Sequence, residues 1–156
     1  MAELSALEDW TAELLRKLQP TQQRRLLVEV ARRLRTANAQ RMRAQTDPEG
    51  QAWQPRKPPG TLRSQRERLR QQAKQRTPMF AKLRQQRHLK AKGQGNAAVV
   101  EFAGRAHRIA RVHHFGESDA VNPGGPMYDY PARELLGITA ADIDTVRDVV
   151  LAHLQA

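Results

Sequence analysis

The chain has 156 residues, enough for one domain with a modest core and an additional arm, and it carries a formal net charge of +11 with a pI of about 11.1. It contains no cysteine, which excludes disulfides and thiolate metal sites. No apolar run approaches the roughly 20 residues of a membrane-spanning helix, and the first residues lack the basic and apolar regions of a signal peptide. We therefore expect a soluble protein, made in the cytoplasm, with no membrane partner.

The charge is distributed unevenly along the chain. Residues 51–115 contain sixteen of the 27 Lys and Arg residues and only two of the 16 Asp and Glu residues. Residues 116–156, in contrast, contain seven acidic and two basic residues. This distribution predicts either a polyanionic partner or a neighbouring protein of complementary charge, such as another copy of the chain.

Residues 4–45 are predicted to form a helical hairpin. Ser5 and Glu8 have the spacing of a capping box, and apolar residues follow at helical intervals until Pro20 ends the first helix. Thr21 caps a second, longer helix that extends to about residue 45. The arginines on the outer face of this second helix are interpreted as a solvated helix surface.

Residues 46–96 are predicted to be a basic, Pro/Arg-rich arm with one short helix. Asp47-Pro48-Glu49-Gly50 has the composition of a turn, and Trp53 is interpreted as an anchor that fixes the following loop to the core. Residues 61–76 have too little apolar surface to order on their own, so we expect an exposed arm that is mobile or partly helical. A short helix over 77–87 and a Lys/Gly-rich loop over 88–96 follow.

Residues 97–156 are predicted to form a sheet and a closing helix. Strands are expected over 97–103, 106–115 and 127–130, and Pro131 disfavours continuation of the last one. A helix begins near Ala140, because Thr139 and Asp142 form a capping-box-like pair. The predicted fold class is therefore α+β: a single domain over residues 1–156 with an N-terminal helical hairpin, a small antiparallel sheet of about three to four strands, a C-terminal helix packed on that sheet, and a basic extended arm.

No set of residues has the arrangement of a catalytic, metal or cofactor site. His113 and His114 are adjacent, so on a strand their side chains would face opposite sides of the sheet, which does not suit a metal. Asp142 and Asp144 do not face the same way on a helix, and acidic residues in a first turn already favour the helix dipole. The glycine-containing stretches lack the lysine of phosphate-binding loops. We therefore expect no enzymatic activity, no cofactor and no bound metal.

The basic centre is the one functional signal that composition provides. Clustered Arg and Lys bind phosphates, with an affinity that falls steeply as salt rises. Aromatic residues make up only 4% of the chain and are not interleaved with the arginines, so a stacking surface for single strands is not expected. A nonspecific nucleic-acid-binding protein is therefore one candidate function.

Four motifs occur in order along the chain. They are Asp47-Pro48-Glu49-Gly50 with Trp53 and Pro55-Arg56-Lys57; Met79-Phe80 with Lys82-Leu83-Arg84; Arg108-Ile109-Ala110-Arg111-Val112-His113 with Phe115-Gly116; and Tyr130-Pro131-Ala132-Arg133-Glu134-Leu135-Leu136-Gly137. Together they resemble the phage virion morphogenesis family, the tail-completion proteins of contractile-tailed bacteriophages and related prophages. The resemblance extends from about residue 20 to the C-terminus.

The resemblance implies a non-enzymatic assembly protein, made late in infection in the bacterial host cytoplasm and incorporated into the virion. Such proteins act at the head-proximal end of the tail and are needed for stable joining of tails to filled heads. The implied partners are other copies of the chain in a ring, with a hexamer as the natural expectation, and tail-terminator, tube or neck proteins. Nonspecific contact with DNA is a further expectation, whereas the family has no catalytic residues to carry over.

Two groups of candidate site residues follow. The candidates for contact with a partner or with DNA are the basic residues of the arm, Arg63, Arg66, Arg68, Arg70, Lys74 and Arg76. The candidate structural or interface residues lie in the family motifs and are Trp53, Phe80, Arg111, His113, Gly116, Tyr130, Pro131, Arg133, Leu136 and Gly137. For Arg133, a buried salt bridge or a sheet-packing role is an equal alternative.

Overall fold

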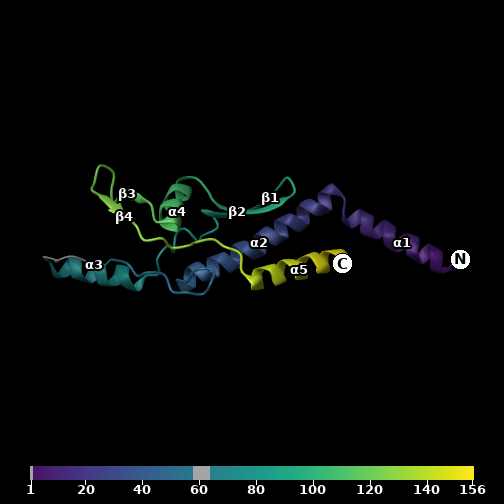
Figure 1. The fold of residues 1–156 in the computed structure, drawn as a ribbon, viewed down its shortest axis with the longest axis horizontal. Helices are drawn as coiled ribbons and strands as arrows, with labels where there is room; N and C mark the ends of the chain where they lie inside the picture. The colour runs from purple at the N-terminus through teal and green to yellow at the C-terminus, as the bar shows by residue number, and fades with distance from the viewer. Residues whose placement is uncertain (1, 58–63) are drawn as a thin grey trace. The chain divides into compact units, whose positions relative to one another are not determined.

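The computed structural model describes residues 2–57 and 64–156, and of residues 2–8 only the backbone. The chain divides into two compact units. Unit 1 combines residues 1–37, 90–101 and 138–156, and unit 2 combines residues 38–89 and 102–137. Each unit is therefore built from segments that lie far apart in the sequence, and Figure 1 labels their elements in chain order.

Unit 1 contains three helical segments and a β-hairpin: α1 (Ala2–Lys17), the first part of α2 (Pro20–Ala44), β1 (Leu89–Gln94), β2 (Ala97–Phe102) and α5 (Ala140–Gln155). The two-residue connection between β1 and β2 makes the pair antiparallel. Gly93 in β1 lies against α2, where a Cβ at this position would be 3.4 Å from side-chain atoms of both Leu27 and Val28. The absence of a side chain at Gly93 thus permits close approach of the strand to the helix.

Both N-terminal helices are present, but their packing differs from the prediction. α1 already begins at Ala2, so Ser5 lies inside the helix and does not cap it. α1 and α2 diverge from the bend at Leu18–Gln19 (Figure 1) and do not lie side by side as a hairpin. α5 packs against α1.

The start of α5 agrees with the prediction in detail. Thr139 Oγ1 accepts a hydrogen bond from the Asp142 backbone N at 3.1 Å, and Asp142 Oδ2 accepts one from the Thr139 backbone N at 2.9 Å. These two bonds form a capping box, which satisfies backbone donors that have no partner inside the helix. Asp142 is also the one residue of α5 that is buried.

Unit 2 contains the end of α2 and four further elements: α3 (Gln65–Arg76), α4 (Arg105–Phe115), β3 (Ser118–Ala120) and β4 (Met127–Asp129). β3 and β4 pair antiparallel, with Asp119 opposite Tyr128. Most of the buried apolar side chains described belong to this unit, namely Met42, Trp53, Met79, Leu83, Leu89, Phe102, Ala106, Ala110, Val112 and Leu135. Among the described side chains of unit 1, only the apolar residues Val30 and Ala31 are buried. The hydrophobic core is therefore concentrated in unit 2.

The predicted strand over 106–115 is wrong, because this segment forms the helix α4. Ala106 and Ala110, four residues apart, are buried on the same helix face, and Gly116 ends the helix with a left-handed φ of +70°. The apolar residues of this stretch fit both a period of two and a period near four, and tertiary packing selects the helix. The C-terminal glycine was the local signal that favoured a helix.

One further agreement and three further differences concern the arm and the sheet. Residues 65–76 form a regular helix, in agreement with a partly helical arm. The segment 77–88 consists of turns instead of the predicted short helix, and Phe80 within it has a φ of +62°, which is incompatible with a helix. Residues 89–94, expected as a loop, form β1. The strands belong to two separate two-stranded sheets, so each sheet is smaller than the three to four strands predicted.

None of the described helices is long and apolar enough to span a membrane.

Candidate functional site

Four aromatic side chains of unit 2 lie edge to face in a continuous series that we call the aromatic row. The row runs from Trp53 to Phe80 to His113 to Tyr130, with ring centroids 5.6, 4.8 and 4.6 Å apart. These residues come from the loop after α2, the 77–88 segment, α4 and the segment after β4. The row therefore connects four segments that are distant in sequence. Each edge-to-face pair of aromatic rings contributes about 0.5–1.5 kcal/mol of stability beyond the burial of its surface.

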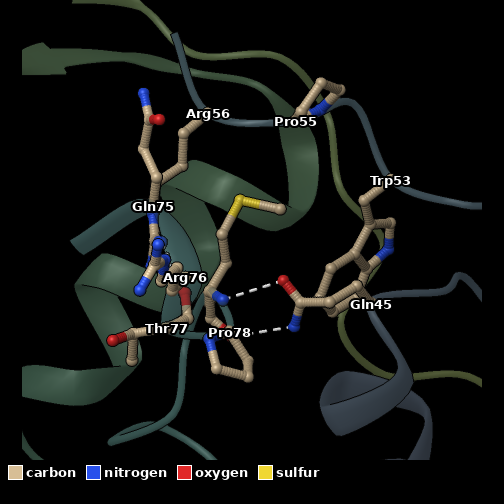
Figure 2. A pocket seen from close by; sticks show the side chains of 9 residues that line it. Gln45, Trp53, Pro55, Arg56, Gln75, Arg76, Thr77 and Pro78 are labelled. Atoms are coloured by element: carbon tan, nitrogen blue, oxygen red, sulfur yellow. Dashed lines mark hydrogen bonds between the residues drawn. The ribbon is translucent and has the colours of Figure 1, made fainter. Parts of the chain in front are cut away.

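Trp53 is fixed by hydrogen bonds at its backbone and at its indole ring. Its backbone N donates to Gln45 O at 2.9 Å, and its Nε1 donates to Glu134 O at 3.2 Å. The Gln45 side chain in turn accepts from the Met79 backbone N at 2.8 Å and donates to Met79 O at 3.1 Å, as the dashed lines in Figure 2 show. Trp53 is buried, as expected of an anchor. Gln45, with a left-handed φ of +62°, is a linking residue that no feature of the sequence indicated.

Arg133 is buried and uses its guanidinium to bind backbone carbonyls. Its Nε donates to Gln54 O at 2.8 Å and its NH2 group donates to Pro55 O at 3.1 Å, while its backbone N donates to His113 O at 2.8 Å. No carboxylate of the described residues lies within ion-pair distance of it, so the alternative of a buried salt bridge is wrong. It also lies outside both sheets. Arg133 holds the loop that follows Trp53 against the segment after β4.

The pKa values of His113 and Arg133 are both shifted by their surroundings. Burial lowers the pKa of His113 below its ordinary value and the Arg133 guanidinium lowers it further, whereas Asp119 raises it. Burial likewise lowers the pKa of Arg133, opposed by Tyr128 and reinforced by Arg56. His113 Nδ1 is buried and has no hydrogen-bond partner among the described residues. The neutral imidazole is therefore the form that fits the aromatic row.

Gly116 and Gly137 lie where two backbone segments approach closely. A Cβ at Gly116 would be 2.8 Å from Ala132 N, so the end of α4 and the chain after Pro131 can meet only at a glycine. A Cβ at Gly137 would overlap Pro48 of the predicted turn. Gly137 N donates to Asn38 Oδ1 and Gly137 O accepts from Arg41 NH2, both at 2.9 Å. Gly137 therefore permits close approach of the chain after Leu136 to Pro48.

The other candidates of the fourth motif lie around this junction without joining the row. Pro131 and Leu136 are half-buried, and the buried leucine of the motif is Leu135, which the sequence did not single out. Leu135 N donates to Nδ1 of His114 at 3.1 Å. The irregular chain from residue 130 to 139 agrees with the expected end of the strand before Pro131.

Arg111 lies on the exposed face of α4, away from the core. Its Nε is 3.0 Å from Glu117 Oε1, in a surface ion pair. His113 and His114 lie on a helix and not on a strand, so their predicted geometry was wrong. Within the described residues, no group of three or more His, Cys, Asp or Glu side chains is placed to hold a metal ion.

The basic candidates lie on α3, except Arg63, which falls outside the described residues. Every described residue of α3 is exposed or half-buried. An open pocket of about 520 Å³ lies between the end of α3 and the Trp53 loop (Figure 2), lined by Gln45, Trp53, Pro55, Arg56, Gln75, Arg76, Thr77, Pro78 and Met79. Arg56 NH1 bridges Lys74 O at 2.5 Å and Thr77 O at 2.6 Å, so it caps the C-terminal end of α3.

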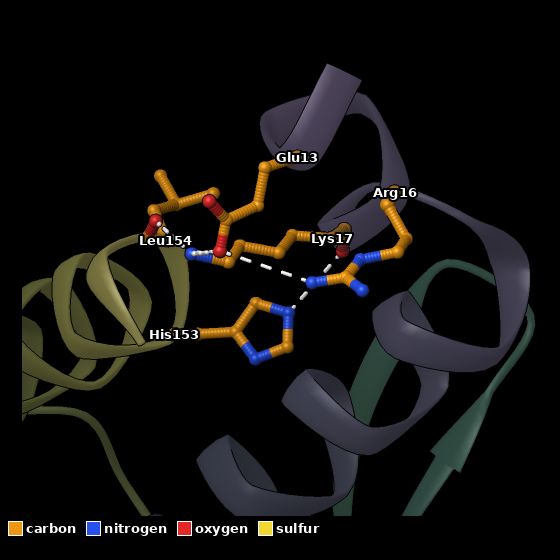
Figure 3. A network of polar contacts seen from close by, with 5 residues as sticks. All are labelled: Glu13, Arg16, Lys17, His153 and Leu154. Carbon is orange, nitrogen blue, oxygen red and sulfur yellow. Dashed lines mark hydrogen bonds and ion pairs between the residues drawn. The ribbon is translucent and has the colours of Figure 1, made fainter. Parts of the chain in front are cut away.

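A second polar cluster lies in unit 1 and joins α1 to α5. Lys17 Nζ donates to Leu154 O at 2.9 Å and is 3.4 Å from Glu13 Oε1, and His153 Nε2 is 3.2 Å from Lys17 O (Figure 3). Arg16 NH2 is 3.8 Å from Glu13 Oε1. These contacts fix the ends of the two helices to each other, and none of the described apolar side chains of α1 and α5 is buried.

Comparison with known proteins gives a consistent result over almost the whole chain. The model of the phage virion morphogenesis family matches residues 2–155. The chain is 36% identical over 156 residues to the tail completion protein S of Escherichia phage P2, covering 99% of each protein. No solved structure matches the chain significantly.

Proposed function

Because the chain belongs to the phage virion morphogenesis family, we propose that it is a non-enzymatic assembly protein that completes the tail at its head-proximal end and supports joining of tails to heads. The observation that carries this proposal is the similarity to a tail completion protein along 99% of both chains. The protein would thus be made in the bacterial cytoplasm and then become part of the virion. Its neighbours there would be tail-terminator, tube or neck proteins.

The apolar surface of unit 1 supports an assembly role. Large apolar side chains of α1 and α5 are exposed, among them Trp10 by 59%, Leu15 by 62% and Leu151 by 53%. Of the sixteen residues of α5, only Asp142, which forms part of the N-terminal cap, is buried. Since an amphipathic helix is normally stabilised by burial of its apolar face, these faces suit a partner that covers them.

We propose that this partner is another copy of the chain, arranged in a closed ring such as a hexamer. The chain combines a basic segment, residues 51–115, with an acidic segment, residues 116–156, so the two segments of neighbouring copies would attract each other. Head-to-tail contacts between unlike surfaces generate a ring when the rotation closes. Sedimentation of the wild-type protein and of a W10S/L15S/L151S variant tests the proposed ring. We expect the wild-type protein to sediment as an oligomer and the variant to shift to the monomer. An unchanged oligomer would contradict it.

The test of the assembly role is electron microscopy of lysates from a phage or prophage that lacks this gene. We expect filled heads and separate tails, and joined particles once purified protein is added. A matched control is the addition of a G137V variant, whose side chain would overlap Pro48 and which we expect not to restore joining. Normal joined particles without the gene would refute the proposal.

The exposed basic helix α3 favours one second candidate, a nonspecific nucleic-acid-binding protein. That function predicts tight, salt-sensitive binding together with normal particles when the gene is absent. The same lysates therefore separate the two functions.

A further inference from the structure

α3 is a helix that packing against the rest of unit 2 does not stabilise. None of its twelve residues is buried, and its single large apolar residue, Leu69, is 60% exposed. An isolated helix of this length is marginal in water, because the first turn is costly to form. Something other than a hydrophobic face must therefore hold it.

Its two ends supply that stabilisation. At the N-terminus, Ser64 and Glu67 form a complete capping box, with both hydrogen bonds at 3.2 Å. At the C-terminus, the Arg56 guanidinium donates to the Lys74 and Thr77 carbonyls, and Thr77 Oγ1 donates to Ala73 O at 3.0 Å. Figure 2 shows Arg56 beside Gln75, Arg76 and Thr77. A polar segment is thus kept helical from both ends, which fixes the directions of its side chains.

Those side chains form a row of positive charge. Arg66, Arg70 and Lys74 are separated by four residues each, so they follow one face of the helix at steps of about 6 Å. Arg68 and Arg76 add two further cations on other faces of the helix, and Glu67 is its one acidic residue. Several basic residues elsewhere pair with carboxylates of the same chain, as in Arg33–Glu29, Lys92–Glu101 and Arg108–Asp119. Within the described residues, none of the five cations of α3 has such a partner.

We propose that α3 binds the phosphate backbone of duplex DNA through Arg66, Arg70 and Lys74, independently of base sequence. Duplex DNA presents a continuous series of phosphates to such a row. Residues 64–76 contain no aromatic side chain, so α3 offers no stacking surface for single strands. An acidic protein is the less suitable ligand, because protein interfaces are anchored by buried aromatic and apolar side chains and α3 offers only Leu69. The choice of DNA rests on the proposed function, since a protein at the head-proximal end of the tail lies where DNA leaves the head.

The test is fluorescence anisotropy of the full chain with short labelled duplexes of unrelated sequence, over a range of salt concentrations. The variant R66Q/R70Q/K74Q removes three cations and keeps good helix-forming residues. We expect its logarithmic salt slope to be smaller by about 2.7, from about 0.9 per phosphate contact, and its affinity at low salt to fall by about tenfold or more. Circular dichroism should show unchanged helix content.

Two further variants separate the role of α3 from net charge and from side-chain shape. R24Q/R25Q/R32Q removes the same charge from exposed positions of α2, and we expect its salt slope to stay near that of the wild type. R66K/R70K keeps the charge, and we expect it to bind almost as the wild type does. An equal loss in the α2 variant, or equally tight binding of polyglutamate in place of DNA, would overturn the inference.

DNA affinity and particle assembly are separate measurements. A wild-type chain that restores joined particles but binds no duplex would overturn this inference and leave the proposed function standing. A chain that binds duplex DNA through α3 but restores no joining would uphold the inference and refute the proposed function.

Discussion

Replacement of Arg133 by alanine should destabilise unit 2 far more than replacement of an exposed arginine. The two hydrogen bonds from its guanidinium to Gln54 O and Pro55 O are charge-assisted, and bonds of this kind contribute about 1.5–3 kcal/mol each. Gln54 and Pro55 are exposed, so water can replace part of the loss. We therefore expect R133A to lower the free energy of unfolding by about 3 kcal/mol. R133M keeps most of the apolar stem, so we expect it to lower the free energy of unfolding by about 2 kcal/mol.

The assay is urea denaturation followed by the fluorescence of Trp53, in a W10F background that leaves Trp53 as the only tryptophan. Trp53 reports on unit 2, because its indole donates to Glu134 O next to Arg133. The matched control is R111A, which removes an exposed arginine in a surface ion pair and should cost less than about 1 kcal/mol. If R133A and R111A cost the same within error, the carbonyl contacts of Arg133 do not stabilise the unit and the reasoning is refuted.

Three other predictions concern the same unit and the last helix. G116A should cost about 2 kcal/mol or more, because its Cβ would meet Ala132 N at a left-handed φ; a loss below about 0.5 kcal/mol would contradict this. The folded state lowers the pKa of His113, so the unfolded chain binds the proton more tightly and stability should fall as pH drops below about 6.5. H113F should flatten that part of the urea-midpoint profile, and an identical profile would exclude His113 as its cause. T139A should remove one capping bond and cost about 1 kcal/mol, seen as faster hydrogen exchange in the first turn of α5.

Elements with agreeing local signals could be predicted from the sequence. The start of α5 is encoded within four residues by Thr139 and Asp142, and Pro20 separates the first two helices by its own backbone geometry. β1 could not be recognised, because its lysines and Gly93 have the composition of a loop. The reason for Gly93 is close approach to Leu27 and Val28, some 65 residues away, which no local pattern reveals.

The candidate site was predictable as a set of residues but not as an arrangement. The motifs singled out Trp53, Phe80, His113 and Tyr130, yet nothing in their spacing indicated that their rings form one row. Gln45 joins two of the segments through a side-chain amide that looks ordinary at the end of a helix. The C-terminal end of α3 likewise receives two hydrogen bonds from Arg56, a residue about 20 positions away that no local pattern identifies.

Because unit 1 combines residues from both ends of the chain, it can be completed only at the end of translation. Residues 38–137 already include every segment of unit 2, so its core can form while the ribosome is still adding the end of the chain. Unit 1 needs Lys17 to meet Leu154, a separation of 137 residues. The N-terminal helix therefore waits for the last turns of α5 to emerge, and a prematurely terminated chain would retain the core of unit 2 while losing the helix pair of unit 1. Only completed chains would then contain the joined helix pair of unit 1.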